Sequence, residues 1–375
     1  MTEERVRTDE EREGPPAAGT RASSEQFPCR ECGAGMRWDP ERDALACDFC
    51  GATREVEVLA DEIVERPLEE AGDAARGLGL ELRVVQCRNC GARLALEPPV
   101  TSDSCAYCGS TKVMVQEANR NAIRPESLVP LDVGKRQVEE QFKKWLRKLW
   151  FRPNELKRAK RFDAVGIYVP FWTFDCLADS QWTAMSGTYY YVPVTQPVMV
   201  NGKLQMQTTM QQRVRWKPAR GERSDVYDDL HVHASKGRCA ELVRELGPFD
   251  TSGLVPYRPE YLAGWRAEEY QIDLADGWEA GRREIHEDQR RRCGADVPGD
   301  TQRDLRVRTE LSDVRWKHVL LPIWSLSYRF RGATYAVLIH GQTGRVVGKA
   351  PYSFVKIVAA ILAVCVVLAL YLALG

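Results

Sequence analysis

The chain has 375 residues, of which 53 are basic and 53 acidic, so its formal net charge at neutral pH is zero. This balance excludes the overall basic excess that is typical of nucleic-acid-binding proteins, and the acidic excess of a solvated, disordered chain. A hydrophobic content of 44% is ordinary for folded protein, and the length is sufficient for two or three domains.

The N-terminal 26 residues are polar and contain few large apolar side chains, which predicts a disordered tail over 1–26. The opening letters, MTEERVRTDEEREGPP, include no apolar core, so we expect no secretory signal peptide. Eight of the twelve cysteines form four C-x-x-C pairs. This pattern favours metal ligands in a reducing cytosol over a disulfide framework.

The four cysteine pairs form an internal repeat over residues 27–58 and 83–117. Each half reads C-x2-C-x14-C-x2-C, with Gly directly after the second cysteine of each pair. Four thiolates in a tetrahedron suit zinc, and a C-x-x-C-G turn directs two sulfurs at one ion. The sequence therefore predicts two zinc ribbons, each with one zinc ion. The ligands are Cys29, Cys32, Cys47 and Cys50 in the first ribbon and Cys87, Cys90, Cys105 and Cys108 in the second.

The charges of the two ribbons favour a protein partner over nucleic acid. Residues 27–58 carry 4 basic and 7 acidic side chains, and residues 83–117 carry 4 and 3. Each zinc held by four thiolates adds about two further negative charges. A phosphate-binding surface requires the opposite balance. Because protein fills all four ligand positions, no position is left for a catalytic water.

The segments after the first ribbon differ in charge and in the spacing of their apolar residues. Residues 59–82 are acidic and predict a linker with one or two helical turns. Further along, VGKRQVEEQFKKWLRKLW has apolar residues at helical spacing, which predicts a basic amphipathic helix over 135–151. An Asn201-Gly202 turn between alternating flanks predicts a hairpin.

The remaining patterns predict an α+β domain over 130–352. Helical patterns lie at 236–246 and 275–292, between strand-like runs. Two of these runs, YVPFWTFD and LLPIWSLS, align with each other, so we expect two similar β units flanking a helical insert. His231 and His233 alternate with apolar residues, which predicts exposed histidines on one strand face.

The basic segment over 135–161 carries 11 basic and 3 acidic side chains, interleaved with aromatic residues. The structural interpretation packs the apolar stripe on the β domain and leaves the basic residues in water. A functional one places the basic face against anionic lipid head groups. Nucleic acid is the third option, and this segment is where it has electrostatic support.

The last residues, Ile357 to Leu374, form an 18-residue stretch without a charge or proline. As a helix this stretch is about 27 Å long, close to the thickness of the hydrocarbon core of a bilayer. Arg345, Lys349 and Lys356 lie on its N-terminal side. The sequence therefore predicts a single transmembrane helix over 357–374 in the cytoplasmic membrane, with the preceding residues in the cytoplasm.

Several blocks carry a family resemblance over most of residues 29–352. They are the two CxxCG…CxxCG repeats, RPESLVPLDV, KWLRKLWFRPNEL, GIYVPFWTFD and LLPIWSLSYRFRGATYAVLIHGQTGRVVGKAPYS. With these blocks the chain resembles a bacterial family of membrane-anchored double zinc-ribbon proteins. Their ribbons are of the transcription-factor-IIB type, and they are often labelled by analogy with the primosomal helicase protein N′. The helicase label is not supported here, because this sequence has no phosphate loop.

The resemblance implies the same eight zinc ligands and no catalytic residues. Some similar proteins belong to membrane-associated systems with flotillin-like (SPFH-domain) proteins and phage-shock-type membrane-stress proteins. A partner of either kind is therefore what the resemblance implies.

Taken with the residue patterns, this predicts a tail-anchored cytoplasmic adaptor that is not an enzyme. The alternative is a membrane-tethered nucleic-acid-binding protein that uses residues 135–161. The oligomeric state stays open.

Overall fold

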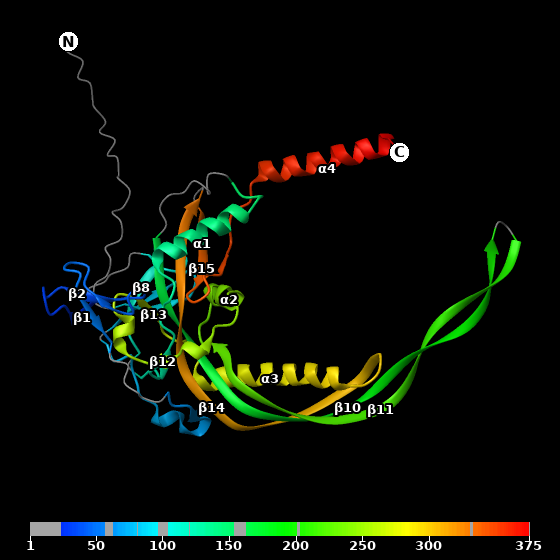
Figure 1. Ribbon diagram of the computed structural model, residues 1–375, viewed down its shortest axis with the longest axis horizontal. Helices are drawn as coiled ribbons and strands as arrows, with labels where there is room; N and C mark the ends of the chain where they lie inside the picture. Colours follow the sequence, from blue (N-terminus) through cyan, green and yellow to red (C-terminus); the bar gives the residue numbers. More distant parts are fainter. Residues whose placement is uncertain are drawn as a thin grey trace, which may run out of the picture.

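The computed structural model has a mixed α+β fold with large sheets, two clusters of four cysteines and an apolar C-terminal helix (Figure 1). Most of the predicted tail over 1–26 lies outside the described residues, and so do parts of the linker, the second ribbon and the basic segment. The structure describes residues 24–56, 63–80, 82–96, 104–119, 121–153, 163–200, 203–330 and 333–374.

The first cysteine cluster belongs to a small antiparallel sheet, residues 24–56, which we call module 1. Trp38 fixes this module to the large domain. Its ring makes an edge contact with Tyr261 at 4.6 Å between centroids, and its carbonyl accepts a hydrogen bond from Trp265 Nε1 at 3.0 Å. The strands, in sheet order, are β1 (Ser24–Pro28), β2 (Gly35–Asp39), β3 (Ala44–Ala46) and β4 (Thr53–Glu55).

The second cysteine cluster belongs to module 2, residues 82–117 where described. Its strands β6 (Arg83–Cys87), β7 (Arg93–Leu96) and β8 (Val113–Glu117) continue the large sheet, because β7 pairs with β13 (Arg266–Glu268). The sequence predicted a separate small ribbon here. The structure instead gives a module whose edge strand is shared with the large domain.

The segment between the modules also packs on the large domain. After residue 62 it forms β5 (Arg66–Pro67) and the 3-10 helix η1 (Leu68–Asp73). Strand β5 pairs with β14 (Thr301–Phe330), and Glu65 forms an ion pair with Lys317 at 2.7 Å. The described part of the expected linker is therefore part of the folded body.

Three long strands dominate the large domain. Strand β10 (Asp163–Val200) pairs antiparallel with β11 (Lys203–His233) on one side and with β14 on the other. Figure 1 shows β10 and β11 leaving the body together as a long curved arm. The shorter strands are β9 (Ser127–Leu128), β12 (Val255–Pro256), β15 (Ala333–His340) and β16 (Val346–Gly348).

Helix α3 (Leu274–Asp296) lies along the curved strands, and small residues allow it to approach closely. Gly277 faces the ring of Trp172, and Gly281 faces Phe174. Both aromatic rings are fully buried, so this contact forms part of the core. The other helices are α1 (Lys135–Lys148), α2 (Arg238–Glu245), α4 (Phe354–Leu374), and the 3-10 helices η3 (Thr251–Gly253) and η4 (Pro259–Leu262).

The two similar sequence blocks lie on neighbouring antiparallel strands. Tyr168 on β10 stands opposite Pro322 on β14. The predicted hairpin pairing also forms, since Val200 pairs with Lys203; Asn201 and Gly202 between them lie outside the described residues. The expected exposure of the histidines was wrong for His233. It is 7% exposed and packs against Phe171, because the strand face that carries it is covered by the core at this point.

Candidate functional sites: two cysteine clusters, a cavity and a helix junction

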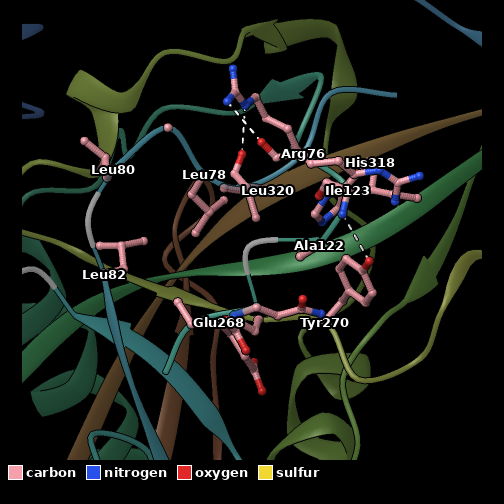
Figure 2. A pocket seen from close by; sticks show the side chains of 16 residues that line it. Arg76, Leu78, Leu80, Leu82, Ala122, Ile123, Glu268, Tyr270, His318 and Leu320 are labelled. Atoms are coloured by element: carbon pink, nitrogen blue, oxygen red, sulfur yellow. Dashed lines mark hydrogen bonds between the residues drawn. The ribbon is translucent and has the colours of Figure 1, made fainter. Parts of the chain in front are cut away.

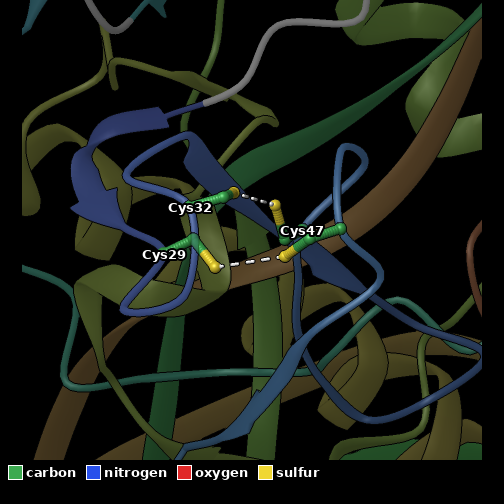
Figure 3. A group of neighbouring side chains, drawn as sticks. Cys29, Cys32 and Cys47 are labelled. Carbon is green, nitrogen blue, oxygen red and sulfur yellow. Dashed lines mark hydrogen bonds between the residues drawn. The ribbon is translucent and has the colours of Figure 1, made fainter.

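Each group of four paired cysteines is brought together by the fold. Figure 3 shows the cluster of module 1. In module 1 the Sγ atoms of Cys29 and Cys50 are 3.5 Å apart, as are those of Cys32 and Cys47. A disulfide has a sulfur–sulfur distance of about 2.05 Å, so these are separate thiols. Four sulfurs at about 2.3 Å from one zinc ion stand about 3.8 Å from each other. The observed spacing therefore fits a four-thiolate zinc ion.

Module 2 has the same arrangement. The sulfur–sulfur distance is 3.7 Å between Cys87 and Cys108, and 3.6 Å between Cys90 and Cys105. The side-chain amide of Asn89 donates to Cys108 Sγ at 3.5 Å. An N–H donor to sulfur stabilises the thiolate form that a metal requires.

The backbone repeats the same turn at each cysteine pair. The N–H of the glycine after each pair donates to the carbonyl of the first cysteine, at 2.8–3.0 Å in all four turns. Each of these glycines has a positive φ, between 64° and 85°, which is why glycine follows the second cysteine. In module 1 the backbone N–H groups of Cys50 and Phe49 lower the pKa of Cys47 to about 7.

The two clusters differ in how deeply they are buried. Three of the four cysteines in module 2 are buried, whereas Cys32 and Cys50 of module 1 are exposed. Module 2 is held at its second turn, where the fully buried Tyr107 donates to Glu268 Oε2 at 2.7 Å. Ser325 Oγ donates to the carbonyl of Ala106 at 2.8 Å. This turn is therefore covered by the large domain.

The equivalent turn of module 1 is open to solvent. Phe49 stands 58 positions before Tyr107 and occupies the same place between a pair of cysteines. Its side chain is 79% exposed, while that of Tyr107 is 0% exposed. The repeat thus places one aromatic residue inside the protein and its counterpart at an outer tip. Sequence alone could not distinguish them, because the large domain decides which tip is covered.

A cavity of about 440 Å³ lies between the segment around residues 76–82, the segment 118–124 and the large sheet (Figure 2). Leu78, Leu80 and Leu82 form one wall. At the opposite side Tyr270 accepts a hydrogen bond from the backbone N–H of Ile123 at 3.1 Å. The sequence offered no signal for this cavity, because its walls come from segments that are far apart in the chain.

The polar groups around the cavity bind mainly to one another. Arg124 donates to the carbonyls of Gly77 and Arg76 at 2.8 and 3.1 Å. Glu269 pairs with Arg93 at 2.9 Å. Burial lowers the pKa of His318 to about 4, so this histidine is neutral near pH 7. The cavity therefore has an apolar wall and a polar rim whose groups are largely hydrogen-bonded or ion-paired within the protein.

A further group of carboxylates, Asp175, Asp228 and Asp229, lies at the bulge where β10 and β11 change register. Lys317 forms ion pairs with Asp229 and Glu65, both at 2.7 Å. The negative charge of the cluster is thus balanced by the buried Lys317 of the same sheet. The carboxylates therefore have a structural role.

Helices α1 and α4 meet at a junction of their ends. The ammonium group of Lys356 donates to the carbonyls of Trp150 and Arg152 at 3.1 and 2.9 Å. The guanidinium of Arg152 lies 3.6 Å above the ring of Tyr352 and also donates to the carbonyl of Ala350. The start of α4 is therefore tied to the residues that follow α1.

The junction is surrounded by exposed apolar and basic side chains. Trp150 is 76% exposed, and Tyr352 and Phe354 are also exposed. On α1 the apolar residues Val138, Phe142 and Leu146 are buried, as predicted for the stripe. The helix predicted over 135–151 ends at Lys148, so Trp150 lies beyond the buried stripe. The basic residues on the outer face of α1 are Lys135, Arg136, Lys143, Lys144, Arg147 and Lys148.

Helix α4 is long and apolar enough over Phe354–Leu372 to cross a membrane, and none of that stretch is buried in the protein. A core helix of a soluble protein would be covered by its neighbours. The predicted span over 357–374 lies within this helix.

No family model matches the chain, and no solved structure matches it. A relative in Bacillus subtilis (strain 168), named uncharacterized protein YdjG, is 28% identical over 337 residues. The match covers 89% of this chain and 92% of the relative, so the two proteins are similar along most of their lengths.

Proposed function

We propose that the protein is a tail-anchored adaptor, in which module 1 recruits a protein partner to the cytoplasmic membrane. The observation that carries this proposal is the exposure of Phe49 on a cysteine-held tip while its counterpart Tyr107 is buried. Exposed aromatic residues on rigid elements are the usual anchors of protein interfaces. A solvent-exposed phenylalanine also has a cost in water that a partner would remove.

Each cysteine cluster holds one zinc ion in this proposal. The donor set of four thiolates and the sulfur spacing support zinc. The zinc makes a module of only four short strands rigid enough to present a binding tip. In module 2 the second zinc ion fixes a turn against the large domain.

Helix α4 crosses the membrane once, with the folded body on the cytoplasmic side. The basic residues before α4 support this orientation. Trp150, Tyr352 and Phe354 lie at the level of the lipid head groups, where aromatic side chains are favoured. The basic face of α1 lies next to them, so anionic lipids hold the body close to the bilayer.

The partner is a membrane-associated protein, and flotillin-like and phage-shock-type proteins are the kinds that the family resemblance suggests. Module 1 carries more acidic than basic residues, so its partner presents basic residues around an apolar pocket for Phe49. Anchoring both proteins at one membrane raises their effective concentration without any new contact.

The test is a crosslinked pull-down of the full-length protein from native membranes, with wild type compared with Phe49→Ala. We expect the amount of recovered partner to fall about tenfold or more in the variant, as for the loss of an interface anchor. Val115→Ala is the matched control, because Val115 is 67% exposed on module 2. Equal recovery with wild type and Phe49→Ala would refute the role of this tip.

The second candidate function is binding of nucleic acid near the membrane through residues 135–161. It is supported by the six exposed basic side chains of α1. The same pull-down reads it: nucleic acid would be recovered in a salt-sensitive manner and lost in Lys144→Glu/Lys148→Glu. A protein partner that survives this double variant favours the adaptor.

A further inference from the structure

The outer part of the β10–β11 hairpin extends beyond the rest of the sheet. Strand β14 pairs with β10 as far as Gly187, opposite Thr301. From there to Val200, β10 pairs with β11 alone among the described residues. We call this outer part, residues 188–200 and 203–215, the distal arm. Figure 1 shows it projecting away from the body.

The two faces of the distal arm differ in character. Alternate residues of a strand point to opposite faces, and the register places the odd-numbered residues of β10 opposite the even-numbered residues of β11. One face carries large apolar side chains from both strands: Tyr189, Tyr191, Met199, Leu204, Met206 and Met210. We call it the apolar face. The other face carries Tyr190 and valines on β10, but β11 presents mainly glutamines, Arg213 and Arg215 there.

This apolar face is open to solvent. Its six large side chains are between 41% and 69% exposed. A two-stranded hairpin is marginally stable on its own in water, and needs a further layer against its apolar face. Single exposed apolar residues are ordinary, but a group of large exposed apolar side chains on one face marks a surface that another element covers.

We propose that the apolar face of the distal arm packs against the same face of a second copy of this protein. At about 100 Å² or more for each large side chain, the face offers about 600–700 Å² per copy. A stable interface buries about 800 Å² per partner, so two arms and their flanking residues reach the required size. Two hairpins stacked face to face form a small two-layered sandwich.

The charges and prolines of the arm favour this occupant. The distal arm contains three charged residues: Lys203 at the start of β11, and Arg213 and Arg215, which the register places on the other face. The apolar faces of two copies can therefore approach without repulsion. Pro193 and Pro197 have no backbone N–H, and they interrupt the row of donors that an added strand at the β10 edge would need. Packing through the face is therefore favoured over pairing through the edge.

A lipid bilayer is a poorer occupant. The arm has open strand edges, and unpaired backbone N–H and C=O groups are costly in hydrocarbon. The inference does not depend on the adaptor function, because it concerns a surface on the opposite part of the molecule from module 1.

The test uses two full-length copies with different tags, expressed in the same membranes. Photoreactive p-benzoylphenylalanine replaces Met206 in one copy, and the matched control carries it in place of Gln207. These neighbours are both exposed but point to opposite faces of the arm. We expect irradiation to join the two tagged copies when the probe is at position 206, and not at position 207. An adduct from position 206 to lipid or to a different protein, or no adduct, overturns the proposal.

A pair of charge variants gives an independent readout. Met206→Glu/Met210→Glu places two carboxylates on the apolar face, whereas Gln207→Glu/Gln211→Glu places them on the other face of the same strand. We expect co-purification of the two tagged copies to fall at least tenfold in the first variant and to stay unchanged in the second. Unchanged co-purification in both variants contradicts the proposed interface. Zinc content and circular dichroism show whether each variant has folded.

Discussion

Glu268 is a buried carboxyl group, 5% exposed, at the point where module 2 meets the large sheet. Desolvation raises its pKa to about 7, although the hydrogen bond from Tyr107 acts in the opposite direction. In the unfolded chain the same group has a pKa near 4.5. The folded state therefore binds this proton more tightly than the unfolded state does.

The sign of the resulting pH dependence follows from this difference. Between about pH 4.5 and 7 the folded protein holds a proton that the unfolded chain has released, so the contribution of Glu268 to stability falls as pH rises through this window. A shift of this size corresponds to up to about 3 kcal/mol. Glu268→Gln cannot ionise, and we expect its stability relative to wild type to increase by an amount of this order from pH 4.5 to pH 8.

Denaturant unfolding of wild type and Glu268→Gln at both pH values measures this difference. Protonation of the zinc thiolates at low pH affects both proteins equally, so it cancels in the comparison. The same pH slope in both proteins would mean that Glu268 is hydrated in solution.

The cysteines give a second prediction at this scale. Loss of one of four ligands is expected to unfold its module and release its metal, so zinc content should fall from about two to about one per chain in both Cys47→Ser and Cys105→Ser. Metal analysis that still finds two tightly bound zinc ions in either variant would contradict the four-thiolate assignment.

The two variants should differ in what else they affect. Cys105→Ser removes the support of Tyr107 and of the strand that module 2 shares with the large sheet. Thermal unfolding of the large domain should therefore begin at a lower temperature in Cys105→Ser than in Cys47→Ser.

At the scale of elements, helix α3 packs closely on the long strands. A Cβ atom on Gly277 would stand 2.6 Å from Trp172 Cδ1. That indole cannot move aside, because its Nε1 donates to the carbonyl of Ile272 at 2.9 Å within the core. A Cβ atom on Gly281 would meet Phe174 and Val232 at 3.3 Å, which requires a far smaller adjustment.

We therefore expect Gly277→Ala to destabilise the protein by about 1–3 kcal/mol, as for other overpacked cores. The better helix propensity of alanine returns about 1 kcal/mol at either position. Gly281→Ala should accordingly stay within about 1 kcal/mol of wild type. Denaturant midpoints of the two variants measure the contrast, and equal midpoints would show that Trp172 has room to shift.

At the scale of the whole molecule, the sequence predicted what depends on local spacing. The cysteine pairs, the stripe of Val138, Phe142 and Leu146, and the apolar run after Ile357 are each encoded within a few turns of chain. Their structures follow from that spacing. The burial of Tyr107 and the exposure of Phe49 depend on residues more than a hundred positions away, and no local pattern contains them.

The length of the distal arm also could not be predicted from the sequence. An Asn-Gly turn predicts that two strands pair, but alternation of side chains sets only which face each residue lies on. How far the β10–β11 pair extends beyond the rest of the sheet depends on where the pairing of β14 with β10 ends, and β14 comes later in the chain. The cavity beside Leu78 is hidden for the same reason.

Removal of residues 357–375 tests the anchor of the whole molecule. We expect the shortened protein to move from the membrane to the soluble fraction, because α4 supplies the long apolar span. Fractionation at low and high salt measures this. If the shortened protein stays on membranes at low salt and leaves at high salt, the basic face of α1 is the main anchor instead.

The distal arm also sets a length. Its 13 residues per strand, from 188 to 200, reach about 43 Å beyond the last pair with β14. For a molecule fixed in a sheet of lipid, such a reach defines a circle within which a neighbour can be met. Encounters then depend on how many molecules occupy each unit of membrane area, and hardly on the volume of the cell. The fraction of paired molecules would therefore rise with the surface density of the protein in the membrane.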